Sequence, residues 1–313
     1  MDFETVYENI DRFRANIEKV MVGKREVVDL AITCFLAEGH LLIEDVPGVG
    51  KSMLAKAIAK SIEAKAKRIQ FTPDLLPSDI TGSTIYNQKD ESFAFSPGPV
   101  FGHIILADEI NRATPRTQSS LLEAMEERQV TVDGTTYPLE RPFFVIGTQN
   151  PIEFEGTYPL PISQLDRFMM KAGFGYLGKA DEVRMLRERK ETLPIEELSP
   201  VLTVAEICAM QEMVRRVKVE DSLYGYIVDI VASTRTSDQL ALGASPRTTL
   251  RLFRAAQATA LMGKRSYLIP DDVKTVARPV LAHRVIVKAP VQYKGQPSAS
   301  VLDDILLQVP VPY

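Results

Sequence analysis

Lys51 and Ser52 end a sequence pattern that is suited to binding phosphate. The stretch LLIEDVPGVGKS, residues 41–52, runs from a hydrophobic strand into a glycine-containing turn, and a helical pattern follows it. Glycines in such a turn let backbone N–H groups converge on one anion. The lysine adds positive charge for the β- and γ-phosphates, the serine hydroxyl can bind Mg²⁺, and the helix presents its positive N-terminal end. The pattern therefore predicts a P-loop.

The match to the general P-loop pattern is incomplete. Asp45 occupies the position where G-x-x-x-x-G-K-[ST] has its first glycine, while Gly50 supplies the second. An incidental glycine-rich connection between a strand and a helix is the alternative interpretation. The nucleotide-binding residues expected from this segment are Val46, Pro47, Gly48, Val49, Gly50, Lys51, Ser52 and Met53.

Two adjacent carboxylates follow another hydrophobic strand. HIILADEI, residues 103–110, places Asp108 and Glu109 just past this strand, and ligands bind at the carboxyl ends of parallel strands. Asp108, together with Ser52, can hold Mg²⁺, and Glu109 can polarise the water that attacks the γ-phosphate. The alternative is that the doublet caps a loop. The sequence has no Asn-Lys-x-Asp segment for guanine, which separates it from small GTPases.

Three further polar residues are candidates for catalysis. Asn150 follows the strand FFVIGT and can align the attacking water, although an Asx turn before a proline would use the same residue. Arg167, in SQLDRF, can stabilise the transferring phosphoryl group of a neighbouring subunit, or it can pair with Asp166 at the surface. Arg247 opens a helix in GASPRTTL and could reach across the cleft to the γ-phosphate, or it could be an ordinary surface arginine.

Composition and charge exclude several classes of protein. Hydrophobic residues make up 45% of the 313 residues and charged residues 25%, which is typical of a globular chain, and the net charge of −4 gives no broad basic field for nucleic acid. The acidic start MDFETVYENIDRF is unlike a signal peptide, and no apolar run reaches the roughly 18 residues of a membrane span. We therefore expect a cytoplasmic chain without a transmembrane segment.

Strand and helix patterns alternate in the first part of the chain and predict an α/β fold, a P-loop parallel sheet flanked by helices. The second part has the patterns of an all-helical lid domain, which divides the chain into residues 1–177 and 178–313. Residues 72–102 are expected to be irregular with a small hairpin, and Asp133-Gly134 predicts a hairpin over 129–139. The expected strands are 41–44, 66–71, 103–108, 143–148 and a segment near 170–174. The main expected helices are 3–20, 26–37, 51–64 and 115–127, followed by helices that start near 203, 245 and 270.

Five ordered motifs together resemble the MoxR family of AAA+ ATPases. They are LLIEDVPGVGKS, HIILADEINRATPRTQSSLLEAMEERQV, FFVIGTQNP, LPISQLDRF and GASPRTTLRL, and the resemblance covers nearly the whole chain. It implies that Gly48, Gly50, Lys51 and Ser52 form Walker A, and that Asp108 and Glu109 form Walker B. It likewise implies that Asn150 is sensor 1, Arg167 an arginine finger acting in trans, and Arg247 sensor 2.

The same resemblance implies a function and a kind of assembly. Val22 and Gly23 match a stretch that borders adenine in related ATPases. The implied activity is hydrolysis of ATP with Mg²⁺ in a hexameric ring of identical subunits, which remodels or activates a partner protein. The implied class of partner includes proteins with a von Willebrand factor A-type domain. Residues 72–102 and 129–139 resemble the helix-2 insert and the pre-sensor-1 hairpin, although the second could be a plain exposed turn. The rival interpretations are a nucleic-acid motor or loader and a nucleotide-gated scaffold with little hydrolysis.

Overall fold

The computed structural model describes residues 1–45, 48–89, 91–150, 156–188, 194–289 and 298–312. Five parallel strands form its central sheet in the order β2-β5-β8-β1-β9. They are β1 (Leu41–Glu44), β2 (Ala66–Gln70), β5 (Ile104–Asp108), β8 (Phe144–Gln149) and β9 (Met170–Ala172). The predicted parallel sheet is confirmed. Since β5, β8 and β1 are neighbours, the loops that follow their carboxyl ends lie side by side.

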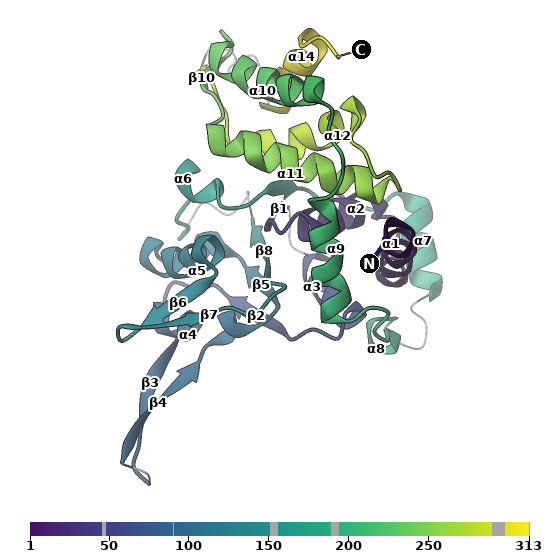
Figure 1. The fold of residues 1–313 in the computed structure, drawn as a ribbon. Helices are drawn as coiled ribbons and strands as arrows, with labels where there is room; N and C mark the ends of the chain where they lie inside the picture. The colour runs from purple at the N-terminus through teal and green to yellow at the C-terminus, as the bar shows by residue number, and fades with distance from the viewer. Residues whose placement is uncertain (46–47, 90, 151–155, 189–193, 290–297, 313) are drawn as a thin grey trace.

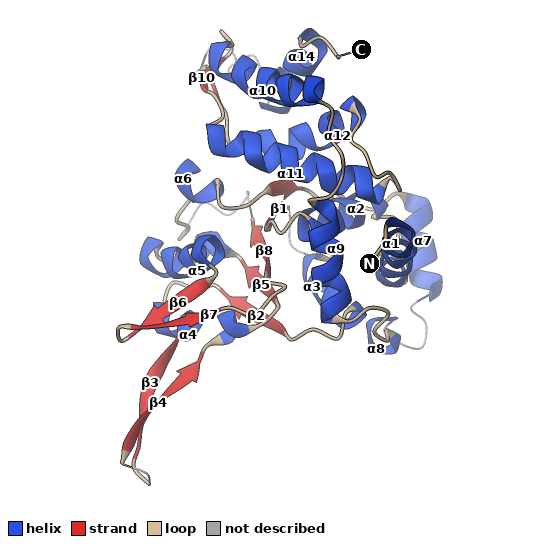
Figure 2. Cartoon of the chain, in the orientation of Figure 1, coloured by secondary structure: helices blue, strands red, loops and turns tan. Residues whose placement is uncertain are grey.

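Helices cover both faces of this sheet (Figures 1 and 2). The alternation along β1 explains why: Leu41 and Ile43 pack into one hydrophobic cluster with three helices, and Leu42 packs into a second cluster with a fourth. The first three are α1 (Phe3–Glu18), α2 (Arg25–Leu36) and α3 (Lys51–Ser61), and the fourth is α5 (Pro115–Glu127). Each was expected from the sequence, and no end differs from the prediction by more than three residues.

Two antiparallel hairpins extend from the sheet side that carries α5. One consists of β6 (Gln129–Val132) and β7 (Thr135–Pro138), and it turns at Asp133 and Gly134, both with positive φ, as the sequence predicted. The other, β3 (Gly82–Asn87) and β4 (Ser92–Pro97), follows the short helix α4 (Pro77–Thr81) and projects away from the body (Figure 1). It is longer than the small hairpin that was expected. Its residues are mostly exposed, so burial leaves no alternating pattern in the sequence from which its length could be predicted. Two 3-10 turns, η1 (Pro99–Phe101) and η2 (Ile110–Arg112), flank β5.

The remainder of the chain is helical, with one short strand pair. Thr203 begins α9 with the predicted capping box to Glu206, and Gly263 ends α11 as predicted. An antiparallel pair, β10 (Leu240–Leu242) with β11 (Ile286–Val287), is an addition to the expected helices. The helices are α7 (Lys179–Glu188), α8 (Pro194–Glu197), α9 (Val204–Val214), α10 (Asp221–Thr236), α11 (Pro246–Met262), α12 (Pro270–Leu281) and α14 (Ser298–Gln308). The division at residue 178 stays a prediction.

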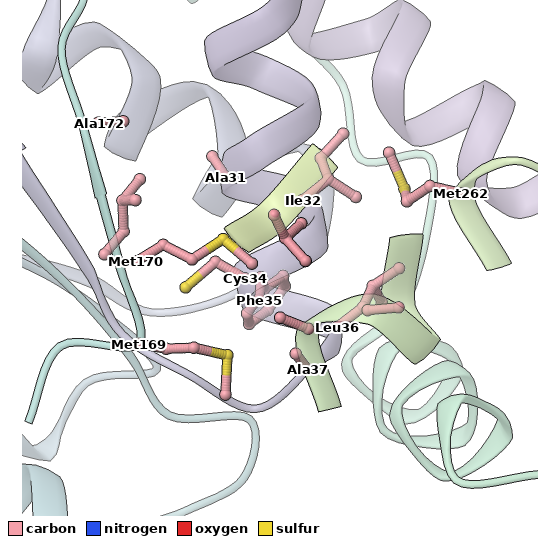
Figure 3. Packing of buried hydrophobic residues seen from close by; sticks show 14 of the residues in the cluster. Ala31, Ile32, Cys34, Phe35, Leu36, Ala37, Met169, Met170, Ala172 and Met262 are labelled. Carbon is pink, nitrogen blue, oxygen red and sulfur yellow. The ribbon is translucent and has the colours of Figure 1, made fainter. Parts of the chain in front are cut away.

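Helix α2 joins the sheet to the lid. Apolar residues from Ala31 to Leu36, with Ala37 just after the helix, pack between β9 on one side and α11 on the other. Met262 of α11 belongs to the same cluster (Figure 3). One continuous core therefore runs from the sheet into the lid, and burial at this density resists independent movement of α2. Within the described part of the chain, no helix is both long and apolar enough to cross a bilayer.

Candidate active site at the carboxyl edge of the sheet

The glycine turn after β1 has the backbone geometry that the sequence predicted. Gly48 and Gly50 have φ of +85° and +107°, in the region that favours glycine, and Gly50 caps α3. Lys51 is the first residue of α3, and its Nζ donates a hydrogen bond to the carbonyl oxygen of Asp45 at 2.6 Å. The turn therefore directs both the lysine and the helix N-terminus toward one place. The predicted residues Val46 and Pro47 lie outside the described residues.

A cavity of about 290 Å³ opens beside this turn. Its lining joins residues that follow three neighbouring strands, and this is the grouping that the sequence predicted. The lining residues are Gly48, Gly50, Lys51, Ser52, Met53, Asp108, Glu109 and Asn150. Burial lowers the pKa of Lys51, while the carboxylates of Asp108, Asp45 and Glu109 oppose this shift. The cavity therefore has a cation, two carboxylates, a hydroxyl and an amide around one space.

The two carboxylates are held by residues that sequence reasoning did not single out. Thr148 of β8 donates its hydroxyl to Asp108 Oδ1 at 2.7 Å and accepts the backbone N–H of Glu109 at 2.8 Å. From β2, Arg68 donates to Asp108 Oδ2 at 2.7 Å and Gln70 donates to Glu109 Oε2 at 3.0 Å. The sheet order puts β2 and β8 on either side of β5, so these contacts depend on strand pairing, which no local motif encodes.

Arg112 and Asn111 complete the surroundings of the pocket. Arg112 Nη1 donates to Glu109 Oε2 at 3.1 Å, so this arginine contacts the predicted general base of its own subunit. Asn111 lies within 3.5 Å of the carbonyl oxygen of Asn150. Both belong to η2, directly after Glu109, and Asn111 connects the end of β5 to the end of β8.

A second cavity of about 320 Å³ adjoins the first and shares Gly48, Gly50 and Met53 with it. Val22 and Val49 line it, and their contact with nucleotide stays a prediction. Gly23 is not among the lining residues: a Cβ at Gly23 would lie 2.6 Å from Asp181 Cγ, so this glycine permits close approach of α7. Sequence reasoning missed the rest of the lining, which comes from the segment between α1 and α2, the connection from β9 to α7, and α7 itself. The remaining lining residues are Val20, Met21, Lys24, Gly175, Tyr176, Leu177, Glu182 and Met185.

This second cavity has the apolar walls that a nucleobase requires. One of its walls, the connection from β9 to α7, is fixed by two side chains: Lys24 Nζ donates to the carbonyl oxygens of Phe174, Gly175 and Tyr176 at 2.6–3.0 Å. Asp45 Oδ2 accepts the N–H groups of Phe174 and Gly175 at 2.6 Å each. The aspartate at the missing first glycine thus connects the P-loop to the segment that leads into the lid.

Arg167 and Arg247 lie outside both cavities. Arg167 precedes β9, whose first residue Met170 pairs with Leu41, the first residue of β1, so it lies at the amino edge of the sheet and the P-loop at the carboxyl edge. Arg247 was predicted to reach across the cleft to its own γ-phosphate, but its Nη1 lies 2.9 Å from Glu126 Oε1. This contact forms because the first turn of α11 lies beside the end of α5. The role of Arg247 at a γ-phosphate stays a prediction.

The remaining predicted residues are brought together, and their chemistry suits a nucleoside triphosphate. A hydroxyl at Ser52 and a carboxylate at Asp108 are hard oxygen ligands of the type that Mg²⁺ prefers. In the described residues, no group of three or more His, Cys, Asp and Glu side chains could hold a metal by itself.

Comparison with known proteins agrees with this chemistry. The family model described as "ATPase family associated with various cellular activities (AAA)" matches residues 40–170, and the model "AAA lid domain" matches residues 232–305. The crystal structure of a protein from Cytophaga hutchinsonii assigned as an ATPase superposes with a TM-score of 0.93 at 37% identity, covering 99% of this chain and 97% of that one. The parallel sheet, the P-loop with its carboxylates and the helical lid define an AAA+ ATPase.

Relatives of known sequence narrow the class further. Chaperone MoxR1 of Mycobacterium tuberculosis is 40% identical over 286 residues, which span 88% of this chain and 75% of that protein. The protein YeaC of Bacillus subtilis is 50% identical over 297 residues, spanning 95% of this chain and 93% of YeaC. The chain belongs to the MoxR family of AAA+ ATPases, which confirms the resemblance seen in its motifs.

Proposed function

We propose that this chain hydrolyses ATP to ADP and phosphate with Mg²⁺ and uses the cycle to remodel or activate a partner protein. The supporting observation is the cavity of about 290 Å³ that joins Lys51, Asp108, Glu109 and Asn150 from the ends of three adjacent strands. Groups for phosphate, metal and water all face this space. A binding scaffold without hydrolysis would not need the groups for water, Glu109 and Asn150, so catalysis explains the arrangement better.

Each side chain then has a defined task. Lys51 and the backbone N–H groups after Gly48 bind the phosphates, and the N-terminus of α3 adds its dipole. Glu109 polarises the attacking water, while Asn150 aligns it without adding negative charge. Bound Mg²⁺ would neutralise charge on the phosphate oxygens, with Ser52 and Asp108 as its protein ligands. The base would occupy the adjoining cavity beside Val22.

We further propose that the site is completed by the neighbouring subunit of a ring, with six subunits as the expected number. Arg167 and Arg247 gather at the amino edge of the sheet with Arg251 around one carboxylate, Glu126, at 4.0, 2.9 and 4.0 Å. Asp166 Oδ2 also lies 4.0 Å from Arg247 Nη1. Three guanidiniums beside these two carboxylates leave an excess of positive charge, which favours a phosphate group from outside the subunit. In a head-to-tail ring, this edge faces the next P-loop. We therefore assign both Arg167 and Arg247 to the site of the neighbour.

A mixing experiment tests the shared site. Arg167→Ala and Lys51→Ala proteins should each lose ATPase activity, on the order of 10³-fold for the arginine. After subunit exchange, an equimolar mixture should recover up to about a quarter of the wild-type rate, because each intact site needs its P-loop from one variant and its arginine from the other. Arg247→Ala should behave as Arg167→Ala does.

The matched control combines two variants with defects on the same side of the site. Lys51→Ala mixed with Glu109→Gln should stay inactive, since neither protein supplies a working P-loop pocket. Absence of recovery in the Arg167→Ala mixture, with subunit exchange verified by fluorescence transfer between labelled subunits, would overturn the shared site.

A protein partner fits better than nucleic acid. The relative MoxR1 carries the name chaperone. By family resemblance, we propose a partner from the class of proteins with a von Willebrand factor A-type domain. The β6–β7 hairpin, where a nucleic-acid motor would carry basic and aromatic residues, has Asp133 at its turn, and the chain has a net charge of −4. ATPase activity stimulated by DNA would favour the motor instead. A cytoplasmic location remains part of the proposal.

A further inference from the structure

The segment that carries Arg167 is held by the lid through its backbone. Arg284, which follows α12, donates Nη2 to the carbonyl oxygens of Asp166 at 3.1 Å and Phe168 at 2.5 Å, and Nη1 to that of Met169 at 3.1 Å. Its Nε also donates to Asp166 Oδ1 at 2.7 Å. One guanidinium from the lid therefore contacts three of four consecutive residues.

The fourth carbonyl is also contacted from the lid. Arg251 of α11 donates Nη1 to the carbonyl oxygen of Arg167 at 3.0 Å, and His283 Nε2 lies 3.1 Å from that of Phe168. Every backbone carbonyl from residue 166 to residue 169 thus has a donor on a lid side chain. These bonds favour movement of the backbone with the lid, because losing them in a buried place is costly. On the sheet side, the N–H of Met169 donates to the carbonyl oxygen of His40 at 2.7 Å.

The side chain of Arg167 is held much less tightly than its backbone. Its Nη1 donates to the carbonyl oxygen of Ser163 at 3.1 Å, and its Nε, without a hydrogen-bond partner, lies 4.0 Å from Glu126 Oε2. The backbone is fixed while the guanidinium can still turn. That combination suits a residue that must reach a site outside its own subunit.

Arg284 is unusual among the arginines for its burial. It is 3% exposed, and burial lowers its pKa to about 10, so it stays charged at neutral pH. A buried charge persists when a carboxylate and several carbonyls surround it, as Asp166 and the segment do here. Its fork geometry allows several simultaneous bonds, which a lysine cannot reproduce.

We propose that Arg284 is a positioning residue that links lid movement to the arginine finger: it carries the 166–169 backbone with the lid and so sets whether Arg167 reaches the neighbouring P-loop. The inference rests on the proposed function, since it requires Arg167 to act in trans. Each subunit would then report the state of its own lid to the next site in the ring. Rigid movement of a packed lid is a known kind of allosteric transition.

The test uses Arg284→Ala in the full-length protein. ATP affinity should stay at the wild-type value because the P-loop lies at the opposite edge of the sheet, while kcat should fall by roughly 10²-fold because the finger is misplaced. Mixed with Lys51→Ala, the variant should recover activity, and mixed with Arg167→Ala it should not. A purely structural role would lower affinity and kcat together and would give no such pattern.

Two further variants keep the test decisive. Arg278→Ala removes an exposed arginine from α12 and should leave every readout unchanged. If Arg284→Ala does not fold, Arg284→Lys takes its place, with an intermediate kcat and the same mixing pattern expected. If Arg284→Ala mixed with Lys51→Ala does not recover activity, while Arg167→Ala mixed with Lys51→Ala does, only the role of Arg284 is overturned. If neither mixture recovers activity, the shared site is overturned.

Discussion

Glu109 has a backbone conformation that few glutamates adopt. Its φ and ψ are 56° and 51°, in the left-handed region, which costs a residue with a Cβ about 1 kcal/mol. Thr148 holds its N–H, and Gln70 and Arg112 hold its carboxylate, so the surrounding side chains maintain the conformation. The result is a carboxylate fixed at the wall of the phosphate cavity, where a general base has to be.

Replacing Glu109 by glutamine tests this role. Glu109→Gln keeps the size and the hydrogen bonds but cannot accept the proton of water, so turnover should fall on the order of 10²- to 10⁴-fold while ATP affinity is retained. Single-turnover hydrolysis and binding of a fluorescent ATP analogue measure the two quantities separately. An equal loss of affinity would show that Glu109 shapes the pocket and does not activate water.

At the scale of elements, the connection between β9 and α7 is tied to the nucleotide site. Asp45 accepts two of its N–H groups and Lys24 donates to three of its carbonyls, and the connection itself forms a wall of the apolar cavity. Bound nucleotide would therefore contact the P-loop and the lid connection at once. This gives the lid a direct means to respond to nucleotide.

Two substitutions of Asp45 test whether it holds the connection between β9 and α7. Asp45→Ala leaves the N–H groups of Phe174 and Gly175 without acceptors, at a cost of about 1 kcal/mol for each lost hydrogen bond. Their amide exchange should accelerate, and ATP affinity should fall by about tenfold. Asp45→Asn keeps an acceptor and should lie between the alanine variant and wild type. Unchanged exchange at both amides in Asp45→Ala would contradict the proposed tie.

At the scale of the whole molecule, buried histidines join its parts and make its stability dependent on pH. His40 precedes β1, accepts the N–H of Val145 at Nδ1 and contacts the carbonyl oxygen of Met125 through Nε2, so it connects the sheet to α5. Burial lowers its pKa from 6.5 to about 3, and burial likewise places the pKa of His283 well below its ordinary value. Both therefore stay neutral in the folded protein.

The sign of the pH effect follows from this neutrality. Between pH 6.5 and about 3 the unfolded chain takes up a proton at His40 that the folded chain does not, so stability falls as pH falls through this window. His40→Gln keeps polar contacts without titrating. Relative to this variant, wild type should lose about 1.4 kcal/mol of unfolding free energy per pH unit. Urea unfolding at pH 7 and pH 5 measures the difference, and parallel curves would refute it.

Much of the catalytic edge could be predicted from the sequence. Lys51, Asp108 and Asn150 each follow a continuous apolar strand, and parallel strands place their carboxyl ends together whatever the details of packing. The helices around them could be predicted equally well, because burial of one helix face places apolar residues every three to four positions in the sequence. Where burial is absent, as in the β3–β4 hairpin, the pattern was weak and the prediction fell short.

Tertiary structure alone decided the rest. The support of Asp108 and Glu109 by Arg68, Gln70 and Thr148 depends on which strands are neighbours, and strand order leaves no mark in a local segment. The location of Arg247 depends on where the lid packs, since helix α11 presents the same sequence in any position. Chemistry that follows a single strand is encoded locally, whereas chemistry shared between elements is set by long-range packing.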